Sequence, residues 1–488
     1  MSIDLSLSDL SRLARVRQVL ADNDPNGQFT SLDMSEVHIG DAVLPRLTEV
    51  IDRHLAAVGR VGGRRSQVRL IVDPVLIRRG GADLKAQVEA LLAARYAVTR
   101  VTLDDGHPIL HADEPVLDQA AKACEGADVI VSVGGGTITD VAKIAAERNG
   151  VPVHVVVQTA ASVDGYTDNF AVVLQNGVKT TLPSRWPQAV LADTKVIADA
   201  PQYLNASGFG ELLSMYAAPG DWYLAARTGM DPKYAPVLLE MLNLCGEGIE
   251  AWSGGIRAGE PEACAKLTTA LAMRGIVTGV GGTTASLSGM EHLISHMFDM
   301  ANGELHEPTG LHGAQVGVGS VIRAAAWEVF CERMAEEGID PSALFSSIDG
   351  REAEVKKGFA WLDPSGRIGA ECWGRYRKKL VGWHGARDKI TSAFADWDGL
   401  RAEQDRLVFG SHKMALYLHR AGAAMRFADL DPAPSPQRLH WAVRNCQFMR
   451  ERFTVADLLT LAGWWDDAGV TRVLNRVEAA CAAAEAAS

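Results

Sequence analysis

Cysteine is scarce in this sequence, with seven residues in 488, and none of them forms a C-x-x-C pair. Disulfide frameworks and cysteine zinc sites need cysteines at regular or close spacing, so the sequence argues against both. The cysteines are also odd in number and scattered along the chain. This usage is typical of a reducing compartment, and we expect a cytoplasmic protein.

Long apolar runs and basic stripes are also missing. No uninterrupted apolar stretch reaches about 18 residues, and the first residues, MSIDLSLSDLSRLARVRQVLADND, contain no apolar signal-peptide core. Acidic residues outnumber basic ones, 60 to 48, which gives a net charge of −12. A chain of this charge repels polyanions. We therefore expect neither membrane insertion nor nucleic-acid binding.

The composition is that of a folded protein. Hydrophobic residues make up 47% and charged residues 22% of the sequence, whereas disordered chains combine low hydrophobicity with a large charge excess. A chain of 488 residues is long enough for two or three domains, each with its own core.

Short β-branched runs alternate with helical stretches between about residues 66 and 200. Strands are predicted at 68–73, 97–103, 128–133 and 152–158, with helices near 83–95 and 115–125 and from 138 onward. This alternation predicts βαβ units and a parallel sheet covered by helices on both faces. Two further runs flank Asn176-Gly177, which predicts a hairpin near 169–182. We expect residues 1–203 to form an α/β domain with an N-terminal helix.

The pattern changes after about residue 204. Long Ala- and Leu-rich segments with a period of 3.6 residues continue to the end of the chain. We expect residues 204–488 to form an all-α domain. It includes an extra helical segment near 335–430 for which the sequence suggests no chemistry.

The stretch SVGGGTITD (132–140) ends a predicted strand and opens a predicted helix, and it contains Gly134, Gly135, Gly136 and Thr137. Glycines allow a phosphate to approach the backbone, and the N-terminus of a helix offers free N–H groups and partial positive charge. A tight turn without a ligand is the alternative. Asp73, at the end of the first predicted strand, is a candidate to bind an adenosine ribose, or else an ordinary loop residue held in a turn by Pro74.

Two histidines lie four residues apart in the predicted helix GMEHLISH (289–296). His292 and His296 therefore project from one helical face, and His312 follows twenty residues after the first of them. Two imidazoles and a carboxylate form a common open site for a catalytic divalent metal. An H-x-x-x-H pair alone is more often a surface or core feature, so this interpretation needs a carboxylate and independent support.

Five segments in order resemble the sn-glycerol-1-phosphate dehydrogenase family. They are VIVSVGGGTITDVAK, VQTAASVDGYTDNFAVVLQNGVKTTLPSRWPQAVLADTKVI, ASGFGELLSMYAAPGDW, SGMEHLISHMFD and LHGAQVGVG. The family belongs to the superfamily of glycerol dehydrogenase, iron-containing alcohol dehydrogenases and 3-dehydroquinate synthase. The resemblance covers about residues 40–330 and implies a nucleotide-binding α/β domain, a helical domain, and a metal and substrate held by the two.

The resemblance also implies roles for individual residues. Asp164 matches an active-site aspartate, and His296 matches a companion histidine that takes part in catalysis. His292, His312 and Glu211 match the metal ligands. The matched cofactor-binding positions are Gly134, Gly135, Gly136, Asp140, Thr159 and Ser162, to which Thr137 and Asp73 are added as candidates.

Two residues depart from the family pattern. The family usually has Asp at the position of Glu211 and Lys at the position of Met215. A charged hydrogen bond contributes about 1.5–3 kcal/mol, so losing one to a substrate phosphate weakens binding about 10- to 100-fold. Lys179, Arg185 and Arg227 are candidates to replace the missing lysine.

The leading functional hypothesis is a metal-dependent NAD(P)H oxidoreductase. It interconverts a small polyol, expected to be phosphorylated and similar to glycerol-1-phosphate, with its ketone. NAD and NADP both stay open, and zinc suits the ligands best, with iron, nickel and manganese as alternatives. The alternative functions are a dehydroquinate-synthase-type cyclase or lyase that uses NAD transiently, and a non-catalytic relative. The resemblance implies a homo-oligomer, with a homodimer expected.

Overall fold

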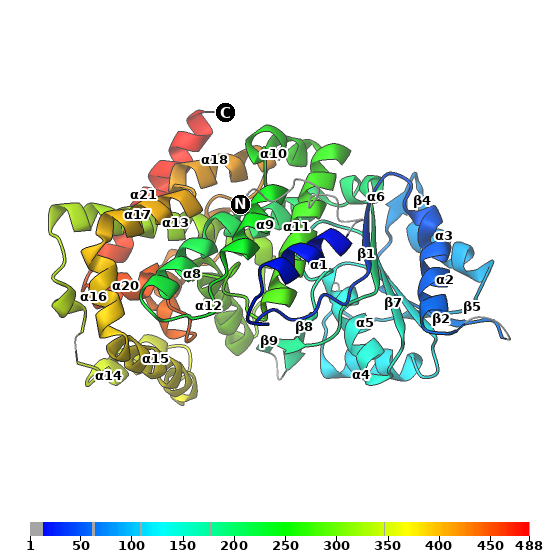
Figure 1. The fold of residues 1–488 in the computed structure, drawn as a ribbon, viewed down its shortest axis with the longest axis horizontal. Helices are drawn as coiled ribbons and strands as arrows, with labels where there is room; N and C mark the ends of the chain where they lie inside the picture. The colour runs from blue at the N-terminus through cyan, green and yellow to red at the C-terminus, as the bar shows by residue number, and fades with distance from the viewer. Residues whose placement is uncertain (1–12, 61–63, 108–109, 176–177, 346, 488) are drawn as a thin grey trace. The chain divides into compact units, whose positions relative to one another are not determined.

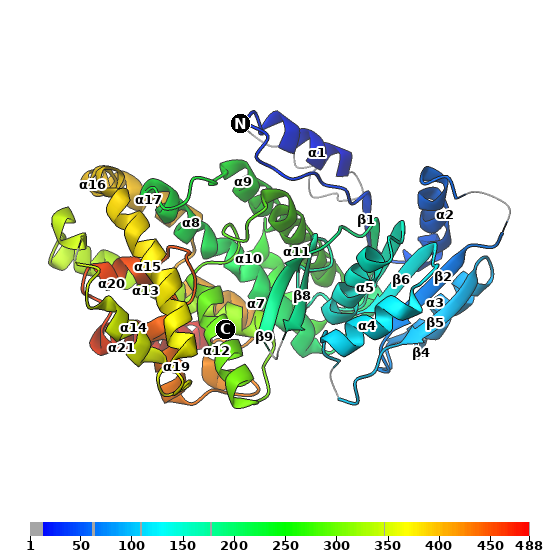
Figure 2. The same cartoon turned by 90° about the horizontal axis from the view of Figure 1, so that it is seen from below.

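The computed structural model describes residues 13–60, 64–107, 110–175, 178–345 and 347–487. Within them the chain forms two compact units. The first unit contains the chain up to Gly208 together with Glu240–Thr283, and the second contains Phe209–Leu239 and the chain from Thr284 onward. Figures 1 and 2 show the ribbon from two directions.

A six-stranded parallel sheet forms the centre of the first unit. The strands run in the order β1-β10-β7-β6-β2-β5, and every neighbouring pair is parallel. Their bounds are β1 (Glu36–Gly40), β2 (Gln67–Val72), β5 (Ala97–Thr102), β6 (Val129–Gly134), β7 (Val153–Gln158) and β10 (Ala189–Asp193). The four predicted strands and the parallel arrangement are confirmed. The edge strand β1 and its neighbour β10 were not predicted, because both are only five residues long.

Helices cover both faces of this sheet, as predicted. One core cluster joins the strands to α2 (Leu47–Ala57) and α3 (Leu84–Ala93). The other joins them to α4 (Glu114–Ala123) and α5 (Gly136–Arg148), and the two pairs lie on opposite sides of the strands in Figure 1. Successive strand residues alternate between the clusters: Leu70 belongs to the first and Ile71 to the second. The predicted N-terminal helix is α1 (Leu13–Asp22).

The predicted hairpin is also present. β8 (Phe170–Gln175) pairs antiparallel with β9 (Val178–Pro183), while Asn176 and Gly177 lie outside the described residues. A buried lysine of α5 fixes the base of this hairpin. Lys143 Nζ donates to Asp168 Oδ1 at 2.6 Å and to the carbonyls of Gly165 and Phe170. A short pair of strands, β3 (Arg78–Arg79) and β4 (Ala82–Asp83), completes the strands of this unit.

The segment 240–283 differs from expectation. We expect it in the helical domain, whereas the structure groups it with the first unit. Its helices are α10 (Ile249–Ala258) and α11 (Pro261–Gly281), and α11 contacts both β1 and α6 (Thr194–Ala198). Helical periodicity reports that a face is buried but does not report which element buries it.

The second unit consists of helices arranged around α13 (His312–Glu336), which packs against α12 (Met290–Leu305), α18 (Ser411–Ala421), α20 (Val455–Leu461) and α21 (Asp467–Ala486). The other α-helices are the end of α7 (Gln202–Leu213), α8 (Ala218–Arg227), the start of α9 (Pro236–Cys245), α14 (Arg351–Phe359), α15 (Arg367–Gly385), α16 (Arg387–Ala395), α17 (Trp397–Leu407) and α19 (Pro436–Asn445). Short 3₁₀ helices are η3 (Leu44–Arg46) in the first unit and η4 (Ser214–Tyr216), η5 (Pro341–Leu344), η6 (Phe427–Asp429) and η7 (Cys446–Phe448) in the second. None of the described helices has the length and apolar character needed to span a membrane.

Glycines let other helices approach α13 at van der Waals distance. A Cβ at Gly317 would lie 2.7 Å from the Cα of Gly210 in α7. A Cβ at Gly319 would lie 2.7 Å from the backbone oxygen of Glu291 in α12. These distances are too short for any residue larger than glycine, so both helix contacts depend on the missing side chains.

Gly317→Ala tests this packing. Because the added methyl group meets the backbone of α7 rather than a movable side chain, we expect a loss of about 1–3 kcal/mol in the free energy of unfolding. Gly254→Ala is the matched control, since a Cβ at that exposed position of α10 meets no atom within 4 Å. It should be neutral or stabilising by about 0.5–1 kcal/mol. Urea denaturation of both variants measures the difference, and equal stabilities would contradict the packing argument.

A second prediction concerns Glu36 in β1. Its carboxylate lies 2.6 Å from His38 Nε2, 2.9 Å from His54 Nε2 and 3.2 Å from Arg53. Burial raises the pKa of Glu36, but these hydrogen bonds and the charge of Arg53 outweigh it and hold the pKa far below the ordinary value of 4.5. The ionised group therefore stabilises the fold above about pH 4.5, and this contribution is lost as the pH falls below that value.

We expect Glu36→Gln to cost about 1–3 kcal/mol at pH 7 and to flatten the fall in stability below pH 4.5. Glu49→Gln on α2 is the control, because that carboxylate is exposed and lies 3.5 Å from Arg53. Denaturation curves at several pH values measure both effects. An equal loss in the two variants at pH 7 would show that the histidine contacts contribute nothing.

Candidate active site

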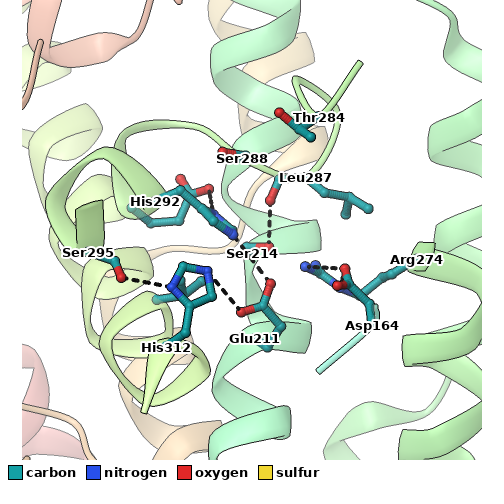
Figure 3. Close-up of polar contacts among 12 residues, drawn as sticks. Asp164, Glu211, Ser214, Arg274, Thr284, Leu287, Ser288, His292, Ser295 and His312 are labelled. Atoms are coloured by element: carbon teal, nitrogen blue, oxygen red, sulfur yellow. Dashed lines mark hydrogen bonds and ion pairs between the residues drawn. The ribbon is translucent and has the colours of Figure 1, made fainter. Parts of the chain in front are cut away.

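Three helices of the second unit bring together one carboxylate and two imidazoles. Glu211 lies near the end of α7, His292 in the first turn of α12, and His312 at the first position of α13. One ligand atom from each residue lies within 4.8 Å of the others. Figure 3 shows the three side chains converging. All three match the metal ligands that the family resemblance implies.

Both rings turn the same nitrogen toward Glu211. His292 Nε2 lies 3.3 Å from Oε1, and His312 Nε2 lies 3.8 Å from Oε2. The carboxylate of Glu211 is buried, and so is His292, whereas the side chain of His312 is 28% exposed. Although Glu is one methylene longer than the Asp usual in the family, its two oxygens reach both histidines.

The other ring nitrogens have partners that sequence reasoning missed. His292 Nδ1 lies 2.9 Å from Glu291 Oε1, and His312 Nδ1 lies 3.0 Å from the hydroxyl of Ser295. Ser295 in turn donates to Gln315 Oε1 at 2.7 Å. Ser295 and Gln315 each lie three residues after a histidine of the site, so helical spacing is the one signal that points to them.

The electrostatic surroundings of the two histidines differ. Burial lowers the pKa of His292, but the adjacent carboxylates of Glu211 and Glu291 outweigh burial and raise the pKa to about 9. Burial also lowers the pKa of His312, and there it prevails over Glu211, giving a value of about 3. Negative charge is thus concentrated on the side of His292, where it favours a cation.

His296 lies beside this group. Its ring stacks at 5.6 Å on that of His312, and its Nδ1 lies 3.9 Å from Asp299. Burial lowers the pKa of His296. His296, Asp299 and His312 form a second group with ligand atoms within 4.8 Å. The structure therefore places the predicted companion histidine at the edge of the metal-ligand cluster.

The glycine turn occupies the expected place in the first unit. It connects β6 to α5, and Gly135 caps the helix without any side-chain hydrogen bond to the first turn. A Cβ at Gly134 would lie 2.9 Å from Ile138, and one at Gly136 would lie 2.9 Å from Val163. Thr137, in the first turn, is half-buried. The sequence thus produces an uncapped helix N-terminus with its backbone close to the surface.

The other nucleotide candidates follow neighbouring strands. Because β7, β6 and β2 are adjacent in the sheet, Thr159, the glycine turn and Asp73 lie at the same carboxyl edge. Such edges are where parallel sheets bind ligands. Asp73 accepts from Lys85 Nζ and from the amide of Val75, so its turn is held in place.

The loop that carries Thr159 and Ser162 is fixed by α7. The amide of Ala161 donates to Asn205 Oδ1 at 3.0 Å. A Cβ at Gly208 would lie 1.7 Å from the carbonyl oxygen of Ala161, so only glycine permits this contact. Thr159 is buried and Ser162 is half-buried.

Asp140 points into the protein rather than along the turn. Its carboxylate accepts from the amide of Val172 at 3.1 Å and lies 3.7 Å from Lys143 Nζ. Burial raises the pKa of Asp140 to about 7 against the influence of Lys143. In the structure Asp140 thus connects α5 to the hairpin strand β8.

Asp164 has a buried cationic partner that sequence reasoning missed. Arg274, 1% exposed in α11, lies 3.2 Å from Asp164 Oδ2 through both Nε and a terminal nitrogen. Figure 3 shows this pair. The two residues are 110 positions apart in the chain, so no local pattern connects them.

Two of the three candidates to replace the missing lysine, Arg185 and Arg227, are engaged elsewhere. Met215 is buried in η4. Arg185 donates to the carbonyl of Val151 at 2.6 Å, and Arg227 forms a surface ion pair with Asp396 at 3.0 Å. The side chain of Lys179 lies outside the described part of the structure.

A third group of potential ligands lies in a loop of the first unit. Asp105, His107 and His111 have ligand atoms within 4.8 Å of one another. Asp105 accepts from the backbone amides of both histidines and from His111 Nδ1 at 2.7 Å. These hydrogen bonds organise the loop and account for the cluster.

Comparison with known proteins adds independent evidence. A family model described as iron-containing alcohol dehydrogenase matches residues 48–201. Glycerol-1-phosphate dehydrogenase [NAD(P)+] of Geobacillus thermodenitrificans is 30% identical over 289 residues, which cover 58% of this chain and 69% of that protein. The enzyme of the same name from Thermococcus kodakarensis is 31% identical over 313 residues, covering 63% and 86%.

Glycerol dehydrogenase from Schizosaccharomyces pombe has a similar fold. It superposes with a TM-score of 0.55 at 15% identity, covering 94% of this chain and 91% of its own. The likeness extends the shared fold beyond the region of sequence similarity. The identity to the curated relatives over most of their length shows that this chain belongs to the glycerol-1-phosphate dehydrogenase family, within the superfamily of iron-containing alcohol dehydrogenases.

Proposed function

We propose that this protein is a metal-dependent dehydrogenase that transfers hydride between NAD(P)H and a small ketone, with a polyol phosphate such as glycerol-1-phosphate as the product. The observation that carries the proposal is the group of Glu211, His292 and His312, in which two Nε2 atoms face one carboxylate. The names of the curated relatives support the reaction and the cofactor.

The residues present fit a divalent cation. Two ligand atoms about 2.1 Å from one tetrahedral ion are about 3.4 Å apart, and the two shortest nitrogen–oxygen distances between these residues are 3.3 and 3.8 Å. Imidazole and carboxylate ligands suit zinc, which we propose as the resident ion. Three protein ligands leave a coordination position for substrate oxygen, as in other catalytic sites.

The first unit has features that fit a dinucleotide. The uncapped N-terminus of α5 offers backbone N–H groups and partial positive charge to a pyrophosphate. Gly134 and Gly136 keep side chains out of this turn. Gly135, Thr137, Thr159, Ser162 and Asp73 are proposed to contact the cofactor from the same carboxyl edge of the sheet, and Asp140 is proposed to support the turn from behind.

When bound, the cation supplies Lewis-acid polarisation of the carbonyl oxygen and the nicotinamide supplies hydride. The protein residues bind and orient these groups. Glu211, His292 and His312 hold the ion, and Asp164, held by Arg274, orients a substrate hydroxyl. His296 is proposed to take part in moving the proton to or from the product oxygen.

The dehydrogenase assay tests the proposed function. Purified protein with zinc, NADH or NADPH and either dihydroxyacetone phosphate or dihydroxyacetone should oxidise the cofactor, faster with the phosphorylated ketone. The absorbance of the reduced cofactor measures the rate, and a chelator should abolish it. Lack of oxidation with every small ketone and aldehyde would contradict the proposal. Phosphate release from a seven-carbon sugar phosphate without net reduction of NAD would instead support the cyclase alternative.

A ligand substitution tests the site itself. We expect His312→Gln to lower kcat/KM by about 100-fold or more and to remove the bound zinc, because an amide is a poor zinc ligand. His412→Gln on α18 is the matched control, since that histidine is exposed and lies in none of the ligand groups found among the described residues. Kinetics together with metal analysis of both variants provide the comparison. Full zinc content in His312→Gln would rule out His312 as a ligand.

A further inference from the structure

We propose that Glu291 is a positioning residue that keeps the Nδ1 proton of His292 in a hydrogen bond, so that Nε2 is the nitrogen offered to a cation. The inference rests on the proposed function, because it concerns the same metal centre. It assigns a role to a fully buried carboxylate that contacts a candidate ligand without belonging to the ligand group.

The geometry indicates which nitrogen of His292 would keep its proton if the other bound a cation. A carboxylate accepts hydrogen bonds and does not donate them. Glu291 Oε1 lies 2.9 Å from Nδ1 and also accepts from the amide of Gly289 at 2.6 Å. Nε2 faces a second carboxylate, that of Glu211, 3.3 Å away, at the position where the candidate ligands meet. If a cation took the place of the proton on Nε2, the remaining ring proton would stay on Nδ1 in the hydrogen bond to Glu291. Partners of this kind orient metal-binding histidines and raise their basicity.

The contact is unusual for two consecutive residues of a helix, whose side chains normally diverge. Glu291 is the second residue of α12, and its side chain turns back toward the helix N-terminus, where free N–H groups are available. A Cβ at Gly289 would lie 2.9 Å from Glu291 Oε2 and 2.6 Å from Asp221 Oδ2. Glycine at this position therefore gives the carboxylate the room to fold back.

The structure also offsets the cost of burying this charge. Arg452, from the segment before α20, attracts Glu291 electrostatically. Its guanidinium donates to the backbone oxygen of Ser288 and to Thr284 Oγ1 at 2.6 Å, which fixes it beside the loop that leads into α12. A buried carboxylate is costly unless charges and hydrogen bonds offset it. Here Oε1 has two hydrogen-bonding partners, and the charge of Arg452 attracts the group.

His312 is held in an equivalent way by a neutral group. The single hydroxyl proton of Ser295 goes to Gln315 Oε1 at 2.7 Å, so its oxygen accepts from His312 Nδ1 at 3.0 Å. Both histidines thus present Nε2 to the same carboxylate. This agreement favours a positioning role for Glu291 over a role in helix capping alone.

Zinc affinity tests the inference. Competition with a chromogenic chelator would give the zinc Kd of the unchanged protein and of Glu291→Gln, Glu291→Ala and Glu304→Gln. We expect the Kd to rise about 10-fold in Glu291→Gln, whose amide oxygen still accepts, and up to about 100-fold in Glu291→Ala. Glu304→Gln is the matched control, because Glu304 lies on the same helix and its side chain pairs with Arg367 at the surface.

The outcomes separate positioning from structural support. A capping role alone would lower the Tm of the Glu291 variants and leave the zinc Kd of the folded protein unchanged, which would overturn the inference. The visible spectrum of the cobalt-substituted protein is a second readout, which we expect to change in Glu291→Gln and not in Glu304→Gln. If Glu291→Ala does not fold, Glu291→Gln decides the question. Absence of zinc binding by the unchanged protein would instead contradict the proposed function.

Discussion

Close backbone contact between α13 and two other helices is the constraint on which the second unit depends. Gly317 meets α7 at Gly210, and Gly319 meets α12 at Glu291, at distances that exclude a side chain. Glu211 directly follows Gly210 in the chain, and His292 directly follows Glu291. His312 is the first residue of α13. The packing that fills the core of this unit therefore also sets the spacing of the candidate ligands, and rigid helices keep that spacing precise.

The chemistry of this unit depends on carboxylate side chains that are buried in its interior. Glu211, Glu291 and Asp221 are buried near the start of α12. The guanidinium of Arg323 offsets the negative charge of Asp221 and donates two hydrogen bonds of 3.0 and 3.1 Å to its carboxylate. The positive charge of Arg452 attracts Glu291. Asp221 and Glu291 thus have donors and a cation near them, as buried charges require. The negative charge that remains around the histidines favours a cation.

Much of the α/β fold follows from local pattern. Strands β6 and β7, in the middle of the sheet, are near-continuous apolar runs, because helices cover both faces there. Strands β1 and β10 give weaker signals, since each is short. The placement of 240–283 depends on partners far away in the chain, which periodicity does not identify. The same limit applies to Arg274, which meets Asp164 from 110 residues away.

The sequence by itself determined the chemical types at the candidate site: a glycine turn between strand and helix, two histidines with helical spacing, and a third histidine twenty residues on. These patterns are local, so they can be interpreted without coordinates. Only the tertiary structure decided that Glu211 reaches both imidazoles, that Glu291 and Ser295 hold their outer nitrogens, and that Asp140 turns inward. Those facts depend on helix packing and on side-chain direction at helix ends, which residue spacing does not encode.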